Sequence, residues 1–318
     1  MAHADWSVDA GKRWMTVAGA AAGDRLTLFA PVPVGDVATL PARLRGMAAG
    51  GSAVLGLDLP LGLPRAYAAG LDAADFLAFL RDLARRPEFF RVCAALSEIS
   101  RDRPFYPMRG VRGMTRVGHA TALGLDGSAA LSRRCDRATA DRPAGAPLFW
   151  TLGANQTGKA ALAAWRDCLI PALTGPDPPL LWPFDGDLHK LLRPGALAVA
   201  ETYPAEAMRH LGVRLAGSKR GQAHCAGAGP ALLAAMARLD AEPDDAMRRA
   251  VADGFGADAA GEDRFDCVLG VLCVINVLRR HRPDGIPVDP WADPWLRRWE
   301  GWVLGQTGLP ASPRPRLP

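Results

Sequence analysis

The order of the apolar segments near the start of the chain constrains the fold more than any other feature. Three short apolar runs, at 2–8, 13–18 and 25–31, are separated by the stretches DAGK and AAGD, which favour hairpin connections. The next stretch, VGDVATLPARLRGMAAGG, predicts a helix that ends in glycines, and 53–58 predicts a fourth strand. A strand reached through a helix usually lies parallel to its neighbour, so we expect a mixed sheet in an α/β fold.

The remainder of the chain is more helical. Apolar residues recur at helical spacing in 72–86 and 155–173, whereas 101–145 lacks a clear period and predicts a long loop or an inserted element. The stretch GALAVAETYPAEAMRHLG, at 195–212, predicts a fifth strand and then a helix that begins at a proline. The stretch DRFDCVLGVLCVINVLRR, at 263–280, predicts a strongly apolar helix.

Composition narrows the class of protein. The chain has 318 residues, 49% of them hydrophobic, which is enough for a sizeable core. No apolar run reaches the roughly 18 residues of a membrane span, and the first residues lack the pattern of a signal peptide. We therefore expect a soluble, cytoplasmic protein with no membrane partner. Six cysteines without CxxC spacing predict buried free thiols rather than zinc ligands or disulfides.

The positive charge of the chain is concentrated in one segment. Residues 101–142, called the basic segment below, contain nine arginines and four aspartates. Their net charge of +5 equals that of the whole chain, so the rest is neutral. A basic segment that contains glycines favours anionic partners, and nucleic acid is the partner we expect.

Acids stand at the ends of several apolar segments. Asp5 lies in the first strand, Asp58 ends the fourth and Glu201 ends the fifth, while Asp263 and Asp266 open the last apolar helix. Each acid alone could cap a helix or close a turn. If the strand ends share one edge of the sheet, however, the repulsion among them requires a cation or a proton. Clustered carboxylates suit Mg²⁺ or Mn²⁺, and two such ions can promote phosphodiester hydrolysis.

Ordered motifs over most of the chain support a resemblance to a known family. They are ADWSVDAGKRWM, VLGLDLPLGLP, PLFWTLGANQTGKAAL followed by LLWPFDG, ETYPAEAMRHLG, DRFDCVLGVLCVINVLRR and EGWVLG. With these motifs the sequence resembles the DUF429 family of predicted nucleases, which have a ribonuclease H-like fold. The resemblance implies a five-stranded mixed sheet flanked by helices, with three antiparallel strands followed by two parallel ones.

The resemblance also implies roles for the acids. Ribonuclease H-like nucleases take catalytic carboxylates from the first strand, the fourth strand and the last helix, the places that Asp5, Asp58 and Asp266 occupy. Glu201 joins them from the fifth strand as a fourth catalytic residue and metal ligand. Asp263 is either a further metal ligand or only a helix cap. The implied cofactor is Mg²⁺ or Mn²⁺.

Three further residues are candidates for binding phosphate or substrate: Arg134, Asn155 and Lys159. The stretch LGANQTGK precedes a helix and favours an anion site at its amino end. It is not a Walker A motif, because Lys159 is followed by Ala160. A solvated surface cation or a helix cap remains the alternative for each residue.

We expect one domain over 1–310, with an insertion at about 65–190 between the fourth and fifth strands, and a disordered tail at 311–318. The function favoured is a divalent-metal-dependent nuclease that hydrolyses phosphodiesters. One alternative is an ATP-dependent phosphotransferase of the same fold, which needs glycine-rich phosphate loops, whereas SVDAGKRW offers one glycine. The other is a non-catalytic module that holds an anionic partner with the basic segment. The fold alone does not choose among them.

Overall fold

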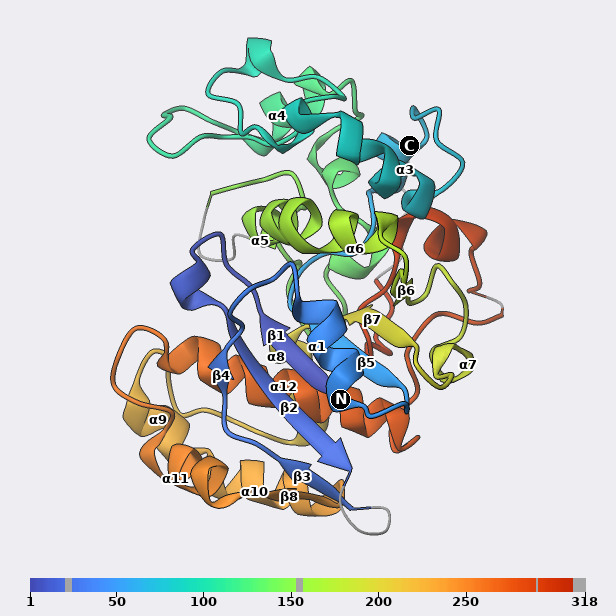
Figure 1. The fold of residues 1–318 in the computed structure, drawn as a ribbon. Coiled ribbons are helices and arrows are strands. Elements are labelled where there is room, and N and C mark those ends of the chain that lie inside the picture. Colours follow the sequence, from blue (N-terminus) through green and yellow to red (C-terminus); the bar gives the residue numbers. More distant parts are fainter. Residues whose placement is uncertain (21–24, 153–156, 290, 311–318) are drawn as a thin grey trace.

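A computed structural model of the chain describes residues 1–20, 25–152, 157–289 and 291–310 (Figure 1). In these residues one sheet of eight strands has the order β6-β7-β5-β1-β2-β3-β8, and β4 pairs with β2. The strands are β1 (Ala2–Asp5), β2 (Trp14–Ala20), β3 (Leu26–Leu28), β4 (Val32–Pro33), β5 (Ala53–Leu57), β6 (Leu180–Leu181), β7 (Leu197–Glu201) and β8 (Ala241–Pro243).

The sheet is mixed, as the sequence predicts. Strand β2 pairs antiparallel with β1, β3 and β4. The pairs β1–β5, β5–β7, β6–β7 and β3–β8 are parallel. An α/β fold with a mixed sheet flanked by helices is therefore confirmed, but the expected number of five strands is wrong. The strands β4, β6 and β8 have only two or three residues, too few to show the alternation by which a strand is recognised in a sequence.

Helices cover both faces of the sheet. They are α1 (Leu40–Met47), α2 (Arg65–Ala68), α3 (Phe76–Asp82), α4 (Arg116–Ala122), α5 (Thr157–Ala164), α6 (Ile170–Thr174), α7 (Leu188–Leu191), α8 (Pro204–Leu211), α9 (Gln222–Gly227), α10 (Gly229–Arg238), α11 (Asp245–Asp253) and α12 (Gly261–Leu278). In Figure 1, α1 lies in front of the sheet and α12 crosses behind it. Every residue of α12 from 265 to 277 is buried, which explains why its sequence is apolar on all sides.

Alternate residues of each strand point to opposite faces, here called the α1 face and the α12 face. On the α1 face the buried residues are Ala2, Ala4, Leu55, Leu57, Leu197 and Val199, which pack with α1 and α5. On the α12 face they include Val54, Ala198 and Ala200, which pack with α12. This alternation decides on which side of the sheet each acid at a strand end falls.

Two glycines let α12 lie close to the sheet around a buried histidine. His3, on β1, is fully buried, and burial lowers its pKa to about 3. A Cβ atom on Gly270 of α12 would lie 2.1 Å from the His3 ring, and one on Gly56 of β5 would lie 3.0 Å from it. The neutral imidazole therefore fills a gap that exists because both neighbours lack a side chain.

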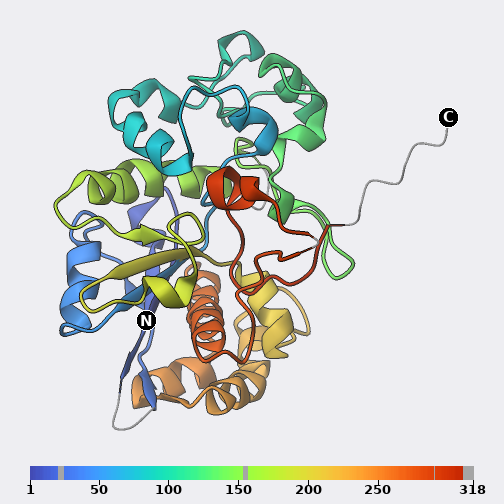
Figure 2. The ribbon, with the colours of Figure 1, turned by 90° about the vertical axis from the view of Figure 1, so that its right-hand side faces the viewer.

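The residues between β5 and β7 form a layer at the carboxyl ends of the central strands. Figures 1 and 2 show α3 and α4 at one end of the molecule, with α5 and α6 between them and the sheet. Buried residues of this layer, such as Phe79 and Trp165, belong to the same hydrophobic cluster as Leu57 of β5. The insertion thus shares its core with the sheet, and its strand β6 pairs with β7. The predicted disordered tail, 311–318, lies outside the described residues.

Composition predicts buried free thiols and no membrane-spanning helix. All six cysteines are free and buried, as predicted. In the described part of the chain, no helix combines the length and apolarity needed to cross a membrane.

Candidate metal centre

Three of the predicted acids lie near enough for their charges to interact at the carboxyl ends of the two central parallel strands. Asp5 ends β1, and Asp58 directly follows β5, where its N–H donates to the carbonyl oxygen of Ala4 at 3.3 Å. Ala4 and Leu57 point to the α1 face, so Asp5 and Asp58 fall on the α12 face. Asp266 comes from the second turn of α12. We call Asp5, Asp58 and Asp266 the carboxylate group.

Burial and mutual repulsion raise the pKa values of the carboxylate group. Burial raises the pKa of Asp58 to about 8, and the charge of Asp266 contributes to the rise. The pKa of Asp5 is raised well above its usual range by burial, and further by Asp58 and Asp266. Burial also raises the pKa of Asp266, to about 6, although a neighbouring lysine opposes the rise. Three carboxylates so placed favour a bound proton or cation.

Asp263 extends the carboxylate group along α12. It precedes Asp266 by three residues and so shares a helix face with it. Burial raises the pKa of Asp263, and the carboxyl group of Asp5 acts on it in the opposite direction. The N-cap residue of α12 is Ala260, so Asp263 is an acid of the first helical turn and not the N-cap.

Sequence reasoning missed Lys219, which lies between α8 and α9. Its ammonium group donates a hydrogen bond to Oδ2 of Asp266 and lies 3.9 Å from Glu262. Burial alone would lower the pKa of Lys219, but Asp266, Asp58 and Glu262 raise it above its usual value. In the sequence, Lys219 stands in AGSKRG, which resembles an ordinary basic turn and gives no signal of this contact.

Glu201 is not part of the carboxylate group. It pairs in register with Leu57 and shares the α1 face with Val199. Both of its carboxylate oxygens accept hydrogen bonds from Arg133 at 2.6 Å, and Oε2 also accepts one from the N–H of Leu61 at 2.7 Å. Although Glu201 and Asp58 line one pocket, the structure pairs Glu201 with a guanidinium instead of leaving it free for a metal.

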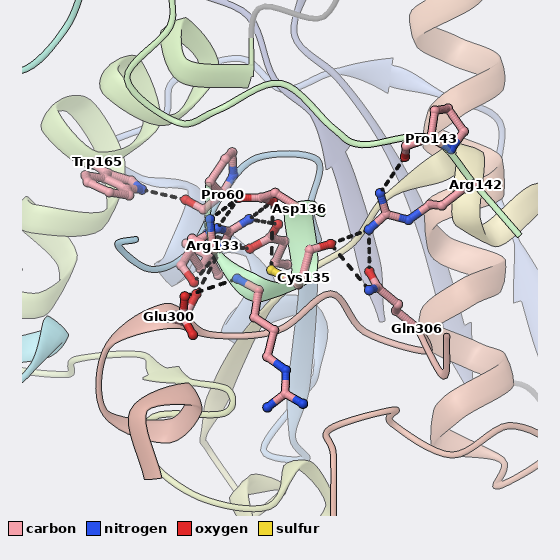
Figure 3. Close-up of polar contacts among 12 residues, drawn as sticks. Pro60, Arg133, Cys135, Asp136, Arg142, Pro143, Trp165, Glu300 and Gln306 are labelled. Carbon is pink, nitrogen blue, oxygen red and sulfur yellow. Dashed lines mark hydrogen bonds and ion pairs between the residues drawn. The ribbon is translucent and has the colours of Figure 1, made fainter. Parts of the chain in front are cut away.

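Arg133 is the centre of a buried ion-pair network (Figure 3). Its side chain is fully buried, and Nε and Nη2 donate to the carboxylate of Asp136 at 2.9 and 2.8 Å. It also donates to the carbonyl oxygens of Leu61, at 3.2 Å, and Glu300, at 3.3 Å. Arg133 therefore joins the insertion, the loop after β5, the end of β7 and the C-terminal segment.

The sequence candidate Arg134 is the neighbour of this buried arginine. Its backbone N–H donates to Oε1 of Glu300 at 3.1 Å, and its guanidinium lies 3.4 Å from the carbonyl oxygen of Trp291. These contacts tie Arg134 to the C-terminal segment and not to the carboxylate group. The sequence SRRCDR does not show which of its two adjacent arginines, Arg133 or Arg134, is buried.

In the described part of the chain, metal-type ligand atoms gather within 4.8 Å of one another inside the Arg133 network and not in the carboxylate group. These atoms belong to Cys135, Asp136 and Glu201. The guanidinium of Arg133 already supplies the positive charge that the two acids require. Burial also raises the pKa of the Cys135 thiol well above its usual range, which disfavours the thiolate form that binds metals. We assign this set to the ion-pair network.

A narrow pocket opens beside Asp58. It is lined by Asp58, Arg133, Arg142, Thr157, Glu201, Thr202 and Tyr203, among others. The pocket offers about 30 Å³ to water-sized molecules, room for about two waters. Water or a small ion fits there, whereas a nucleotide has to bind outside it.

Of the remaining substrate candidates, Lys159 lies at the start of α5. The helix begins at Thr157, which lines the pocket, and Lys159 lies half-buried in its first turn. Asn155 lies outside the described residues. Phosphate binding by Lys159 stays a prediction.

Comparison of the chain with protein-family models, with curated proteins and with solved structures finds no match. A functional assignment therefore depends on the chemistry of the carboxylate group and its surroundings.

Proposed function

We propose that the chain is a divalent-metal-dependent phosphodiesterase that acts on nucleic acid. The observation that carries this proposal is that the like charges of Asp5, Asp58 and Asp266, from β1, the end of β5 and α12, act on one another, with Asp266 buried and the other two half-buried. Such an arrangement costs free energy unless protons or cations compensate the charge, and clusters of this kind are typical of binding sites.

The strand order supports the ribonuclease H-like fold and DUF429 membership that the motifs suggest. The central part of the sheet runs β3-β2-β1-β5-β7. Its first three strands are antiparallel and its last two are parallel to β1, while α12 packs across one face. The three acids then stand on β1, after β5, which is the fourth of these five strands in chain order, and on α12.

The donor atoms fit Mg²⁺ or Mn²⁺. In the part of the chain that the structure describes, Oδ1 of Asp266 and Oδ2 of Asp263 are buried and accept no hydrogen bond. A buried acceptor without a partner is costly, and a hard cation satisfies a carboxylate oxygen. Asp5, Asp58 and Asp266 would hold the ion, with Asp263 beside them. Such an ion polarises a phosphoryl group and stabilises the leaving oxygen.

Part of the basic segment is available to hold a phosphate backbone. Arg142, like Arg133, is buried: it donates to the carbonyl oxygen of Cys135 and, at 2.9 Å, to Oε1 of Gln306 (Figure 3). Four other arginines of the segment are exposed: Arg109, Arg112, Arg116 and Arg137. Exposed arginines supply the sequence-independent attraction that nucleic acids require.

Cleavage of labelled RNA and DNA, single- and double-stranded, tests this function. We expect wild type to cleave at least one of these substrates with Mg²⁺ or Mn²⁺ and none with EDTA. Asp266→Asn should lower the rate at least about 100-fold, since changing residues that only orient a metal ligand already costs about 10–100-fold. Asp72→Asn, an exposed acid outside the group, should keep the wild-type rate.

Two results would contradict the proposal. One is equal cleavage by wild type and Asp266→Asn. The other is salt-sensitive binding of nucleic acid that ignores metal and is followed by no cleavage, which would identify a binding module.

A further inference from the structure

Lys219 lies in a mostly exposed loop that hydrogen bonds tie to α9. Its carbonyl oxygen accepts a hydrogen bond from the Cys225 thiol at 3.2 Å, and the carbonyl oxygen of Ser218 contacts Nδ1 of His224 at 3.0 Å. A Cβ atom on Gly217 would lie 2.4 Å from the His224 ring, so the loop packs closely around that ring. The side chain of Lys219 is only 25% exposed. The structure therefore holds a lysine ammonium group where the surrounding charges are negative.

The two oxygens of Asp266 have different surroundings. Oδ2 accepts the hydrogen bond from Lys219, while Oδ1 is buried and has no partner among the described residues. Asp266 itself is 94% buried, since its exposed fraction is 6%. In two-metal sites the ions lie about 3.5–4 Å apart. One oxygen of Asp266 is thus free for a divalent ion, while the other already contacts a positive charge.

Lys219 also acts on the other acids. Its charge opposes the rise in the pKa values of Asp5, Asp58 and Asp263. The ammonium group of Lys219 therefore offsets part of the negative charge of all these acids, and not only that of Asp266. A second divalent ion at Oδ2 would have to displace this ammonium group from Asp266, which would leave Glu262, at 3.9 Å, as its remaining ion-pair partner.

We propose that Lys219 takes the place of one of the two cations, so that the site binds a single divalent ion. This inference rests on the proposed function, because it presumes that the carboxylate group binds metal. Lys219 is a positioning residue: it holds Oδ2 of Asp266, directs Oδ1 to the ion and supplies the positive charge that a second ion supplies in two-metal sites.

Calorimetric titration of the full chain with Mn²⁺ at neutral pH tests the inference. We expect one Mn²⁺ per chain for wild type and for Lys219→Arg, which keeps the charge. Lys219→Met and Lys219→Gln remove the charge and should each bind two. Arg220→Met is the matched control: Arg220 is 76% exposed and pairs with Glu262, so this variant should still bind one.

The outcomes separate this inference from the proposed function. Two ions bound to wild type, or one ion bound to both Lys219→Met and Lys219→Gln, would overturn the role of Lys219 alone. No Mn²⁺ bound to wild type would overturn the proposed function and this inference together. Circular dichroism of each variant establishes that a change in stoichiometry comes from a folded chain.

Discussion

Replacing Arg133 with methionine is expected to lower the free energy of unfolding by about 3–5 kcal/mol. The change leaves the buried carboxylates of Asp136 and Glu201 without their partner. It also removes the hydrogen bonds to the carbonyl oxygens of Leu61 and Glu300. Thermal unfolding should show this as a drop in Tm of roughly 5–15 °C.

Two further variants locate the cause of this loss. Arg134→Met removes the adjacent guanidinium, whose one described contact is the 3.4 Å approach to Trp291, and should change Tm by no more than about 2 °C. Adding Glu201→Gln to Arg133→Met removes one unpaired charge and should recover part of the loss. Equal Tm values for Arg133→Met and wild type would show that the network does not hold the four segments together.

Asp58→Asn is expected to raise the stability of the metal-free chain at pH 8 while abolishing metal-dependent cleavage. The pKa of Asp58 is about 8 in the folded chain, against 3.8 for an ordinary aspartate. The folded state therefore holds this proton more tightly than the unfolded state does. The stability it confers is complete below pH 4 and is lost as the pH rises towards 8. Asparagine is uncharged at pH 4 and at pH 8. The stability of the variant therefore does not fall over this range as that of wild type does.

Thermal unfolding in EDTA from pH 5 to pH 8.5 measures this effect. We expect the Tm of Asp58→Asn to exceed that of wild type by at least about 4 °C at pH 8 and by progressively less at lower pH. Addition of Mg²⁺ should raise the Tm of wild type more than that of the variant, because a ligand stabilises the state that binds it. Asp72→Asn should follow wild type throughout. A lower Tm for Asp58→Asn than for wild type at pH 8 would contradict the repulsion inferred for the carboxylate group.

The sequence predicted the elements that are long and regular. Strands β1, β2, β5 and β7 and helix α12 have enough residues to show their period or their apolar character. The proximity of Asp5 and Asp58 also follows from the sequence, since parallel neighbours end at one edge of a sheet. The short strands β4, β6 and β8 exist through their pairing partners, which local sequence does not show.

The contacts that the sequence did not predict depend on register and on long-range packing. Glu201 lines one pocket with Asp58, as expected, but it pairs in register with Leu57 on the α1 face, where Arg133 holds its carboxylate. A shift of one residue would have reversed its side, and the sequence of β7 does not fix that register. Arg133 and Lys219 belong to loops, where no periodicity indicates which of two adjacent basic residues is buried.

The central claim is that Asp5, Asp58 and Asp266 hold a divalent cation. Crystals of the full chain grown with Mn²⁺, measured at the manganese absorption edge, test it most directly. We predict an anomalous peak whose ligands include carboxylate oxygens of these three acids, at about 2.0–2.6 Å. A peak bound instead by Cys135, Asp136 and Glu201, or a map without a peak at the carboxylate group, would contradict the claim.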